Sequence, residues 1–205
     1  MTKFITLEGG EGAGKSTAIR FIENALRQRG IPYIVTREPG GTPIAEKIRD
    51  IVLTPQSEWM FPDTEALLMF AARAQHIHAV IKPALASGKY VISDRFTDAS
   101  FAYQSAGRGI SMSRLRELAQ WVLGDFKPDL TLLLDTSVQV GMDRIRSRES
   151  QDRIEQEKNV FFERVRTMYL QLAAEDPKRF RIIHAEKSLS EVEKQIQEAL
   201  ASLFL

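Results

Sequence analysis

The segment that most constrains this chain is a glycine-rich run near its start, Gly9-Gly10-Glu11-Gly12-Ala13-Gly14-Lys15-Ser16. An apolar, β-prone run precedes it (Phe4-Ile5-Thr6-Leu7), and apolar residues at helical spacing follow it from Thr17. A strand, a glycine-rich loop ending in Gly-Lys-Ser and a helix together predict a phosphate-binding loop. Its glycines let backbone N–H groups turn toward phosphate oxygens, and the helix adds the positive end of its dipole. We therefore expect residues 9–17 to bind a nucleoside triphosphate, with Lys15 at its β and γ phosphates and the Ser16 hydroxyl on Mg²⁺.

Length and composition limit the class of protein. At 205 residues, 43% of them hydrophobic and 27% charged, the chain fits one globular domain spanning residues 1–205. Its net charge of +1 gives no overall argument for a nucleic-acid partner, and no apolar run approaches the ~20 residues of a membrane span. The absence of cysteine excludes disulfides, thiolate metal sites and cysteine nucleophiles. Since Met1 leads directly into the first expected strand, we expect no signal peptide and a cytoplasmic location.

Strands and helices are expected to alternate along the chain. Apolar, β-prone runs predict strands over residues 4–7, 31–35, 90–93, 129–135 and 180–184. Helices are expected over 44–53, 111–123 and 161–172, with a long helix over 64–85 that Asp63 caps and Pro83 kinks or restarts. Ser190 and Glu193 predict a capping box at the start of the last helix. This alternation predicts an α/β fold of the phosphate-loop NTPase type, a three-layer α/β/α arrangement around a five-stranded parallel sheet.

Three motifs are expected at one edge of that sheet, because the carboxyl ends of parallel strands lie together. They are the glycine loop, Thr36-Arg37-Glu38-Pro39 after the second strand and Asp94-Arg95 after the third. Asp94 is placed to hold Mg²⁺ directly or through water, although a strand-end aspartate can also simply cap a loop. Arg95 could brace a transferring phosphoryl group. Arg37 suits a bidentate grip on a second phosphate, the alternative being a solvated surface arginine.

Four arginines, Arg144, Arg146, Arg148 and Arg153, lie among acidic residues in one short segment. Such a charge run is most often a solvated face. Phosphoryl transfer, however, needs several cations around the developing charge, and the glycine loop supplies only Lys15. We therefore expect residues 144–157 to form a mobile lid that closes over the triphosphate and excludes water.

Motifs spread over nearly the whole chain resemble those of bacterial thymidylate kinases. They are the segments 4–17, Thr36-Arg37-Glu38-Pro39-Gly40-Gly41-Thr42, Phe70-Ala71-Ala72-Arg73, Asp94-Arg95-Phe96 through Tyr103-Gln104, and Asp152-Arg153-Ile154-Glu155-Gln156-Glu157. The second of these is far more discriminating than the phosphate loop, which many unrelated NTPases share. The resemblance implies a nucleoside monophosphate kinase-like fold and transfer of the γ-phosphoryl group of ATP to dTMP with Mg²⁺. It also implies a homodimer.

The resemblance implies roles for individual residues at the acceptor. Arg37 would bind the dTMP phosphate, Glu11 would approach the sugar 3′-hydroxyl, and Tyr103 would crowd the 2′ position against ribose. Three side chains would contact the thymine edge: Arg73, Ser100 and Gln104. Either Met69 or Phe70 would cover the thymine ring, because Met69 aligns with the stacking aromatic of the family and Phe70 is the next residue.

The implied donor and catalytic residues surround the transferred phosphoryl group. Arg144 would lie near the adenine, and Lys15, Arg95 and Arg148 would be the cations, with Asp94 and Glu11 beside them. Some relatives carry a catalytic arginine where this chain has Gly12. The resemblance therefore points to the bacterial variant, in which Arg148 or a neighbouring lid arginine supplies that charge.

Two other functions remain open from the sequence. One is a kinase for another nucleoside monophosphate or for a deoxynucleoside; only the deoxynucleoside, whose acceptor is a hydroxyl, would need Glu11 or Asp94 as general base. The other is a nucleotide-dependent switch that uses hydrolysis as a timer. A switch needs neither a second phosphate grip at Arg37 nor the base-sized face around Phe70 and Arg73.

Overall fold

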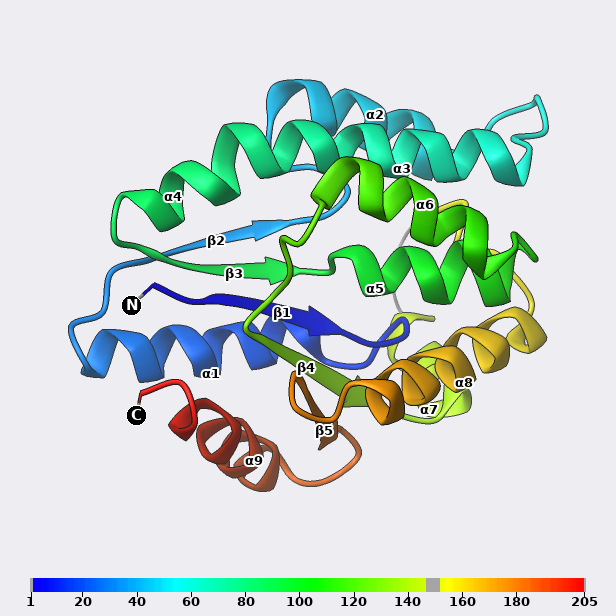
Figure 1. Cartoon of the computed structure of the whole chain (residues 1–205). Helices are drawn as coiled ribbons and strands as arrows, with labels where there is room; N and C mark the ends of the chain where they lie inside the picture. Colours follow the sequence, from blue (N-terminus) through cyan, green and yellow to red (C-terminus); the bar gives the residue numbers. More distant parts are fainter. Residues whose placement is uncertain (1, 147–151, 205) are drawn as a thin grey trace.

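The fold is centred on a five-stranded parallel sheet in a computed structural model that describes residues 2–146 and 152–204 (Figure 1). The spatial order is β2-β3-β1-β4-β5, and each neighbouring pair is parallel. In the central strand, Ile5 lies beside Ile92 on one side and Leu130 on the other. The strand bounds are β1 Phe4–Glu8, β2 Tyr33–Arg37, β3 Tyr90–Asp94, β4 Leu130–Asp135 and β5 Phe180–His184. The predicted α/β fold with a five-stranded parallel sheet is confirmed.

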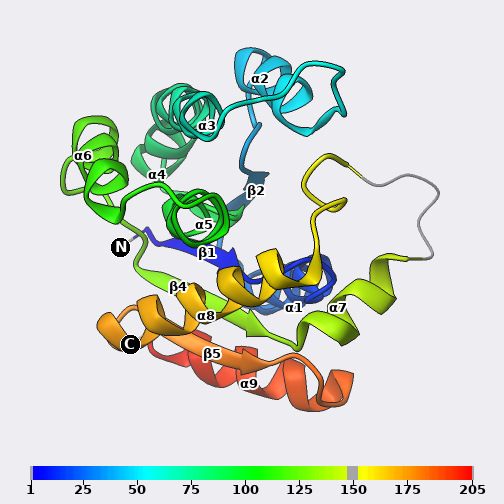
Figure 2. The ribbon, with the colours of Figure 1, turned by 90° about the vertical axis from the view of Figure 1, so that its right-hand side faces the viewer.

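Helices cover both faces of the sheet (Figures 1 and 2). On one face α1 and α9 pack against each other and against the sheet, and most other helices lie on the opposite face. None of the helices described is long and apolar enough to cross a membrane. Their bounds are α1 Lys15–Gln28, α2 Pro43–Leu53, α3 Pro62–His76, α4 Lys82–Ala86, α5 Thr97–Ser100, α6 Met112–Leu123, α7 Val138–Ile145, α8 Asn159–Glu175 and α9 Leu189–Ala201, with π-helical segments η1 Ile77–Ile81 and η2 Phe101–Gly107.

The core divides according to the alternation of side chains along each strand. Ile5 and Leu7 of β1 face the layer of α1 and α9, where they meet Leu132 of β4. Phe4 faces the other layer, and Leu133 packs there with α7 and α8. Because both faces are covered, β4 reads as a nearly continuous apolar run in the sequence.

The long helix expected over residues 64–85 is interrupted by one π-helical turn. The Lys82 N–H donates to the carbonyl of Ile77, five residues earlier, immediately before Pro83. Proline lacks an N–H and crowds the preceding turn, so a wider turn at this point relieves the conflict. Pro83 then lies in the first turn of α4, so the predicted restart is confirmed.

Two predicted helix caps are wrong by about half a turn. The capping box of α9 joins Ser188 and Glu191, not Ser190 and Glu193. The two Ser-x-x-Glu patterns overlap in the sequence, and the earlier one lengthens the helix. Asp63 does not cap α3 but lies in its first turn, because Pro62 suits the first helical position and sets the start two residues earlier.

Candidate active site

The phosphate loop joins β1 to α1 as the sequence predicts. Gly14 precedes α1 with φ 93°, a left-handed conformation in which glycine carries no steric penalty. The Lys15 ammonium donates to the carbonyls of Gly9 (3.3 Å) and Gly10 (3.1 Å). Burial and the nearby Arg95 lower the pKa of Lys15, whereas neighbouring carboxylates oppose that shift. A phosphate group would restore an anionic partner to this ammonium.

Gly12 and Gly141 bring the phosphate loop into backbone contact with α7. A Cβ on Gly12 would lie 2.1 Å from the Gly141 oxygen, and one on Gly141 would lie 2.3 Å from the Glu11 oxygen. Gly12 also has φ 67°. An arginine at position 12, as in some relatives, is therefore excluded here as long as α7 lies against the loop. The contact with α7 thus leaves no space for a side chain at position 12.

Arg95 extends from the end of β3 back to the phosphate loop. Its backbone has φ 71°, an uncommon conformation for a residue with a Cβ. The guanidinium donates to the Gly9 carbonyl (2.9 Å) and to Glu11 Oε1 (2.5 Å), and it lies 4.7 Å from the centre of the Tyr103 ring. The Tyr103 hydroxyl donates to the same Glu11 oxygen (2.9 Å). Residues from the loop, β3 and η2 thus form one cluster around Glu11.

The segment between β3 and α5 is held by a buried acidic side chain, Glu8 at the end of β1. Its Oε1 accepts the N–H of Phe96 (2.8 Å), and its Oε2 lies 2.7 Å from the Tyr169 hydroxyl. Burial, reinforced by the charge of Asp98, raises the pKa of Glu8 to about 8, against the opposing effects of Tyr169, Arg95 and the Phe96 N–H. Glu8 therefore fixes the backbone next to Arg95.

Asp94 and Ser16 line the same cleft as Lys15. Asp94 Oδ1 is buried and has no hydrogen-bond partner among the residues described. Mg²⁺ in kinases takes one or two protein oxygens and completes its octahedron with water and phosphate. No group of three or more His, Cys, Asp or Glu side chains suited to a metal occurs in residues 2–146 and 152–204. An unpartnered carboxylate oxygen near a hydroxyl therefore fits Mg²⁺ bound together with a nucleotide.

The end of β2 supplies the second cationic group of the cleft. Arg37 donates to Glu46 (2.9 Å), and Glu46 also accepts the Gly41 N–H (2.8 Å). Arg49, which was not predicted from the sequence, lies one turn after Glu46 on α2. It lines the same cleft and donates to the Pro39 carbonyl (2.9 Å). Burial and the charge of Arg37 lower the pKa of Arg49. The i, i+3 spacing of Glu46 and Arg49 was the available signal.

A second pocket continues from this cleft and is mostly apolar. It shares Glu11, Arg49 and Arg95 with the charged cleft, and adds a group of larger apolar and polar side chains. The added residues are Pro39, Leu53, Met69, Ala99, Tyr103, Gln104 and Ile154. The cleft of about 380 Å³ and this adjoining pocket have the division expected of a nucleotide site, one part for phosphates and one for a base.

Three residues expected at the base lie behind this pocket. Phe70 packs in a core cluster with Ala66, Ile110 and Leu115, so Met69 is the one of the pair that lines the pocket. Arg73 is fully buried and donates to Glu38 (2.7 Å), Ser100 (3.0 Å) and the Phe96 carbonyl (3.0 Å). Of the expected thymine contacts, Gln104 lines the pocket, whereas Arg73 and Ser100 form its supporting network.

The arginine-rich segment contacts both sides of the cleft. Arg144 donates to the carbonyls of Gly12 (3.1 Å) and Ala185 (3.2 Å). The Arg153 N–H donates to the Leu53 carbonyl (2.8 Å), and its guanidinium pairs with Glu65 of α3. Arg148, the expected catalytic cation, lies outside the described residues.

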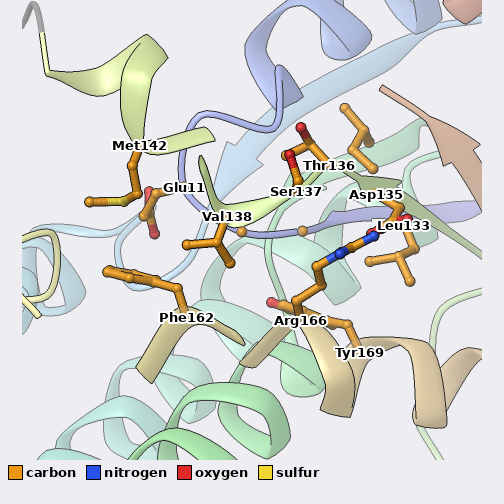
Figure 3. Close-up of a pocket in the computed structure, with 13 residues that line it drawn as sticks. Glu11, Leu133, Asp135, Thr136, Ser137, Val138, Met142, Phe162, Arg166 and Tyr169 are labelled. Carbon is orange, nitrogen blue, oxygen red and sulfur yellow. Dashed lines mark hydrogen bonds and ion pairs between the residues drawn. The ribbon is translucent and has the colours of Figure 1, made fainter. Parts of the chain in front are cut away.

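A small pocket behind the phosphate loop has a different character (Figure 3). The side chains of Val138, Met142 and Phe162 form its apolar side, and Arg166 extends toward Asp135 at the end of β4. Arg166 donates to both Asp135 oxygens (2.7 and 3.0 Å). This ion pair joins α8 to the sheet, so the pocket belongs to the packing behind the loop.

Comparison with known proteins gives a family that agrees with this site. The family model described as Thymidylate kinase matches residues 7–196. Proteins named Thymidylate kinase from Marinomonas sp. (strain MWYL1) and Nitrosospira multiformis are 54% and 52% identical over 98% of this chain, which is 95% and 98% of their own lengths. Another so named, from Ectopseudomonas mendocina, is 52% identical over 98% of this chain and 95% of its own length. The chain belongs to the thymidylate kinase family.

Proposed function

We propose that this protein transfers the γ-phosphoryl group of ATP to dTMP, giving dTDP and ADP. One observation carries the proposal: a phosphate loop and a second set of cations, Arg37 and Arg49, line a single cleft. That cleft is continuous with a pocket of the size and polarity that suit a pyrimidine. A switch protein needs only the first of these features. Membership of the thymidylate kinase family supports the same acceptor.

The proposed chemistry relies on position and charge. A monophosphate is already an anionic nucleophile at neutral pH, so no general base is needed. Lys15 and Arg95 are set to stabilise charge that develops on the transferred group, and we assign Arg148 to the same task. Ser16 and Asp94 would hold Mg²⁺, which when bound neutralises charge on the triphosphate. We assign Arg144 to the adenine side because it lies between the loop and Ala185.

At the acceptor, Arg37 and Arg49 would bind the dTMP phosphate. Glu11 would meet the sugar 3′-hydroxyl, and Tyr103, held by its hydrogen bond to Glu11, would exclude a ribose 2′-hydroxyl. Met69 would cover the thymine and Gln104 would read its edge. Arg73, Ser100 and Phe70 would support this pocket from behind.

An acceptor panel tests the proposal. Protein, ATP and Mg²⁺ are mixed with dTMP, dUMP, dCMP, dGMP, AMP or thymidine, and ADP release is followed. We expect dTMP to give the highest kcat/KM. Stimulation by thymidine instead would identify a deoxynucleoside kinase, and slow release that ignores every acceptor would identify a switch.

We further propose that the protein is a cytoplasmic homodimer. Family resemblance suggests the dimer, and an apolar groove between α3 and α6 offers a surface for it. Leu115, Leu118 and Trp121 of α6 all line the groove, and of these Leu115 is fully buried whereas Trp121 is largely exposed. The cytoplasmic location stays a prediction from the sequence.

A further inference from the structure

Glu65, in the first turn of α3, is a buried carboxylate that the proposed chemistry does not use. Only 1% of its surface is exposed. Three side chains from other segments donate to it: Gln104 (Nε2–Oε1 2.8 Å), Arg108 (Nε–Oε2 3.1 Å) and Arg153. Although burial alone would raise the pKa of Glu65, Arg108, Gln104 and Arg153 together lower it. The carboxylate is therefore ionised at neutral pH.

The charge on Glu65 determines the orientation of the Gln104 amide. An ionised carboxylate can only accept hydrogen bonds, so the Gln104 atom 2.8 Å from it must be the NH₂ group. The opposite orientation would set two oxygens against each other and leave a buried donor unused. The amide oxygen thus points away from Glu65, where it is buried and has no partner among the residues described.

Gln104 lines the base pocket beside Met69 and Tyr103, and only 1% of its surface is exposed. An unpartnered acceptor at this place favours a ligand that brings a donor, because an unmatched buried polar group is costly. Thymine and uracil carry an N–H at ring position 3. Cytosine carries a lone pair there, which would face the Gln104 oxygen without a hydrogen between them.

We propose that Glu65 is a positioning residue for the choice of acceptor base. It holds the Gln104 amide with the oxygen toward the pocket, so that the site takes a pyrimidine with an N3–H and rejects one without it. The inference rests on the proposed function and deepens it. A glutamine alone presents either end of its amide, and the carboxylate behind it removes that freedom.

The variant Glu65→Gln tests this directly, because it keeps the shape of the side chain and removes the charge. The kcat and KM values are measured with dTMP, dUMP and dCMP. We expect kcat/KM for dTMP to fall about tenfold, mainly through KM, and the dTMP-to-dCMP ratio of kcat/KM to fall about tenfold, ~1.4 kcal/mol. The dTMP-to-dUMP ratio should stay constant, since both bases carry the N3–H. An unchanged dTMP-to-dCMP ratio would overturn the proposal.

Controls separate this effect from the other partners of Glu65. Arg153→Ala removes the ion pair between Glu65 and the segment 152–157 but leaves the Glu65–Gln104 hydrogen bond. The dTMP-to-dCMP ratio of kcat/KM for this variant should therefore equal that of the wild type. In a Gln104→Ala background, Glu65→Gln should change the ratio no further, as for two residues acting through one contact. A further drop in that background would contradict the proposal.

A measurement on the wild-type protein covers the case in which Glu65→Gln does not fold. The Gln104 side-chain amide gives a pair of NMR signals that disappear in Gln104→Ala. Donation to a buried carboxylate predicts slow exchange of the bonded proton with solvent, and rapid exchange would overturn the proposal. The acceptor panel distinguishes failure of the proposed function from failure of this inference. A wild type without preference for dTMP refutes the proposed function. A wild type that prefers dTMP, with the same dTMP-to-dCMP ratio of kcat/KM in Glu65→Gln, refutes only this inference.

Discussion

Glu8 makes the stability of the folded protein depend on pH. Its pKa is raised from 4.5 to about 8, first by burial and then by Asp98. Between these values the folded protein keeps a proton that the unfolded chain has released. The contribution of Glu8 to the free energy of unfolding is therefore largest below pH 4.5. It falls as the pH rises toward 8, by at most about 1.4 kcal/mol per pH unit.

We expect Glu8→Gln to remove this part of the pH dependence. The amide oxygen keeps an acceptor for the Phe96 N–H, the amide NH₂ faces the Tyr169 hydroxyl, which can reverse to accept, and the side chain does not titrate. Urea unfolding of wild type and variant at pH 5, 6, 7 and 8 should give curves of stability against pH that diverge, with the wild type falling more steeply. Parallel curves would mean that Glu8 keeps its ordinary pKa in the folded protein.

The phosphate loop and α7 are two elements whose backbones touch at Gly141. Replacing a helical glycine by alanine ordinarily stabilises a helix by about 1 kcal/mol. Gly141 should behave in the opposite way, because its Cβ would lie 2.3 Å from the Glu11 carbonyl oxygen. We expect Gly141→Ala to displace the loop and to lower kcat/KM for ATP by about tenfold or more, with no gain in Tm.

Gln139→Ala is the matched control for this change. Gln139 lies on the exposed side of α7, where it donates to both oxygens of Asp143 (2.8 and 2.9 Å). Steady-state kinetics and thermal unfolding should give nearly wild-type values for Gln139→Ala. A Gly141→Ala protein that is more stable and equally active would show that the loop and α7 separate without cost.

Elements were largely predictable from the sequence, whereas their exact ends and side-chain partners were not. Apolar runs located all five strands, because both faces of the sheet are covered and each run had to be buried. The start of α9 was two residues off because two overlapping Ser-x-x-Glu patterns satisfy the same capping geometry. The pocket proposed for thymine was harder to predict, because the choice between Met69 and Phe70 depends on helix rotation, which packing against α6 determines.

The groove between α3 and α6 is the surface that we propose for dimer formation. Trp121 and Leu67 line the groove between α3 and α6, with 83% and 56% of their surfaces exposed. If this groove forms the proposed dimer, Trp121→Glu should convert the protein from twice the 23.2 kDa chain mass to the single-chain mass in light scattering. Leu189→Glu, a similarly exposed position on α9, should leave the mass unchanged. A wild type that measures as a single chain would refute the dimer.

Contacts between residues far apart in the chain were the part of the site that no local sequence pattern could predict. The sequence placed the phosphate loop, Arg37 and Asp94-Arg95 at one edge, since parallel strands share that edge. Glu65 gave no signal, because its partners Gln104 and Arg153 are 39 and 88 residues away. Gly12 could be recognised as unusual, but its contact with Gly141 required the position of α7.

The strand order β2-β3-β1-β4-β5 separates the acceptor side of the site from the strands on the other side of the phosphate loop, which matters for engineering the protein. The central strand carries the phosphate loop. Residues 33–110, which include β2 and β3, build the acceptor side, and β4, β5 and Arg144 flank the loop on the other side. A library confined to residues 37–73 and 99–110, which leaves Asp94 and Arg95 unchanged, would explore new acceptors while the proposed ATP side stays intact. Each such variant could then be judged by ATP binding before any acceptor is tried.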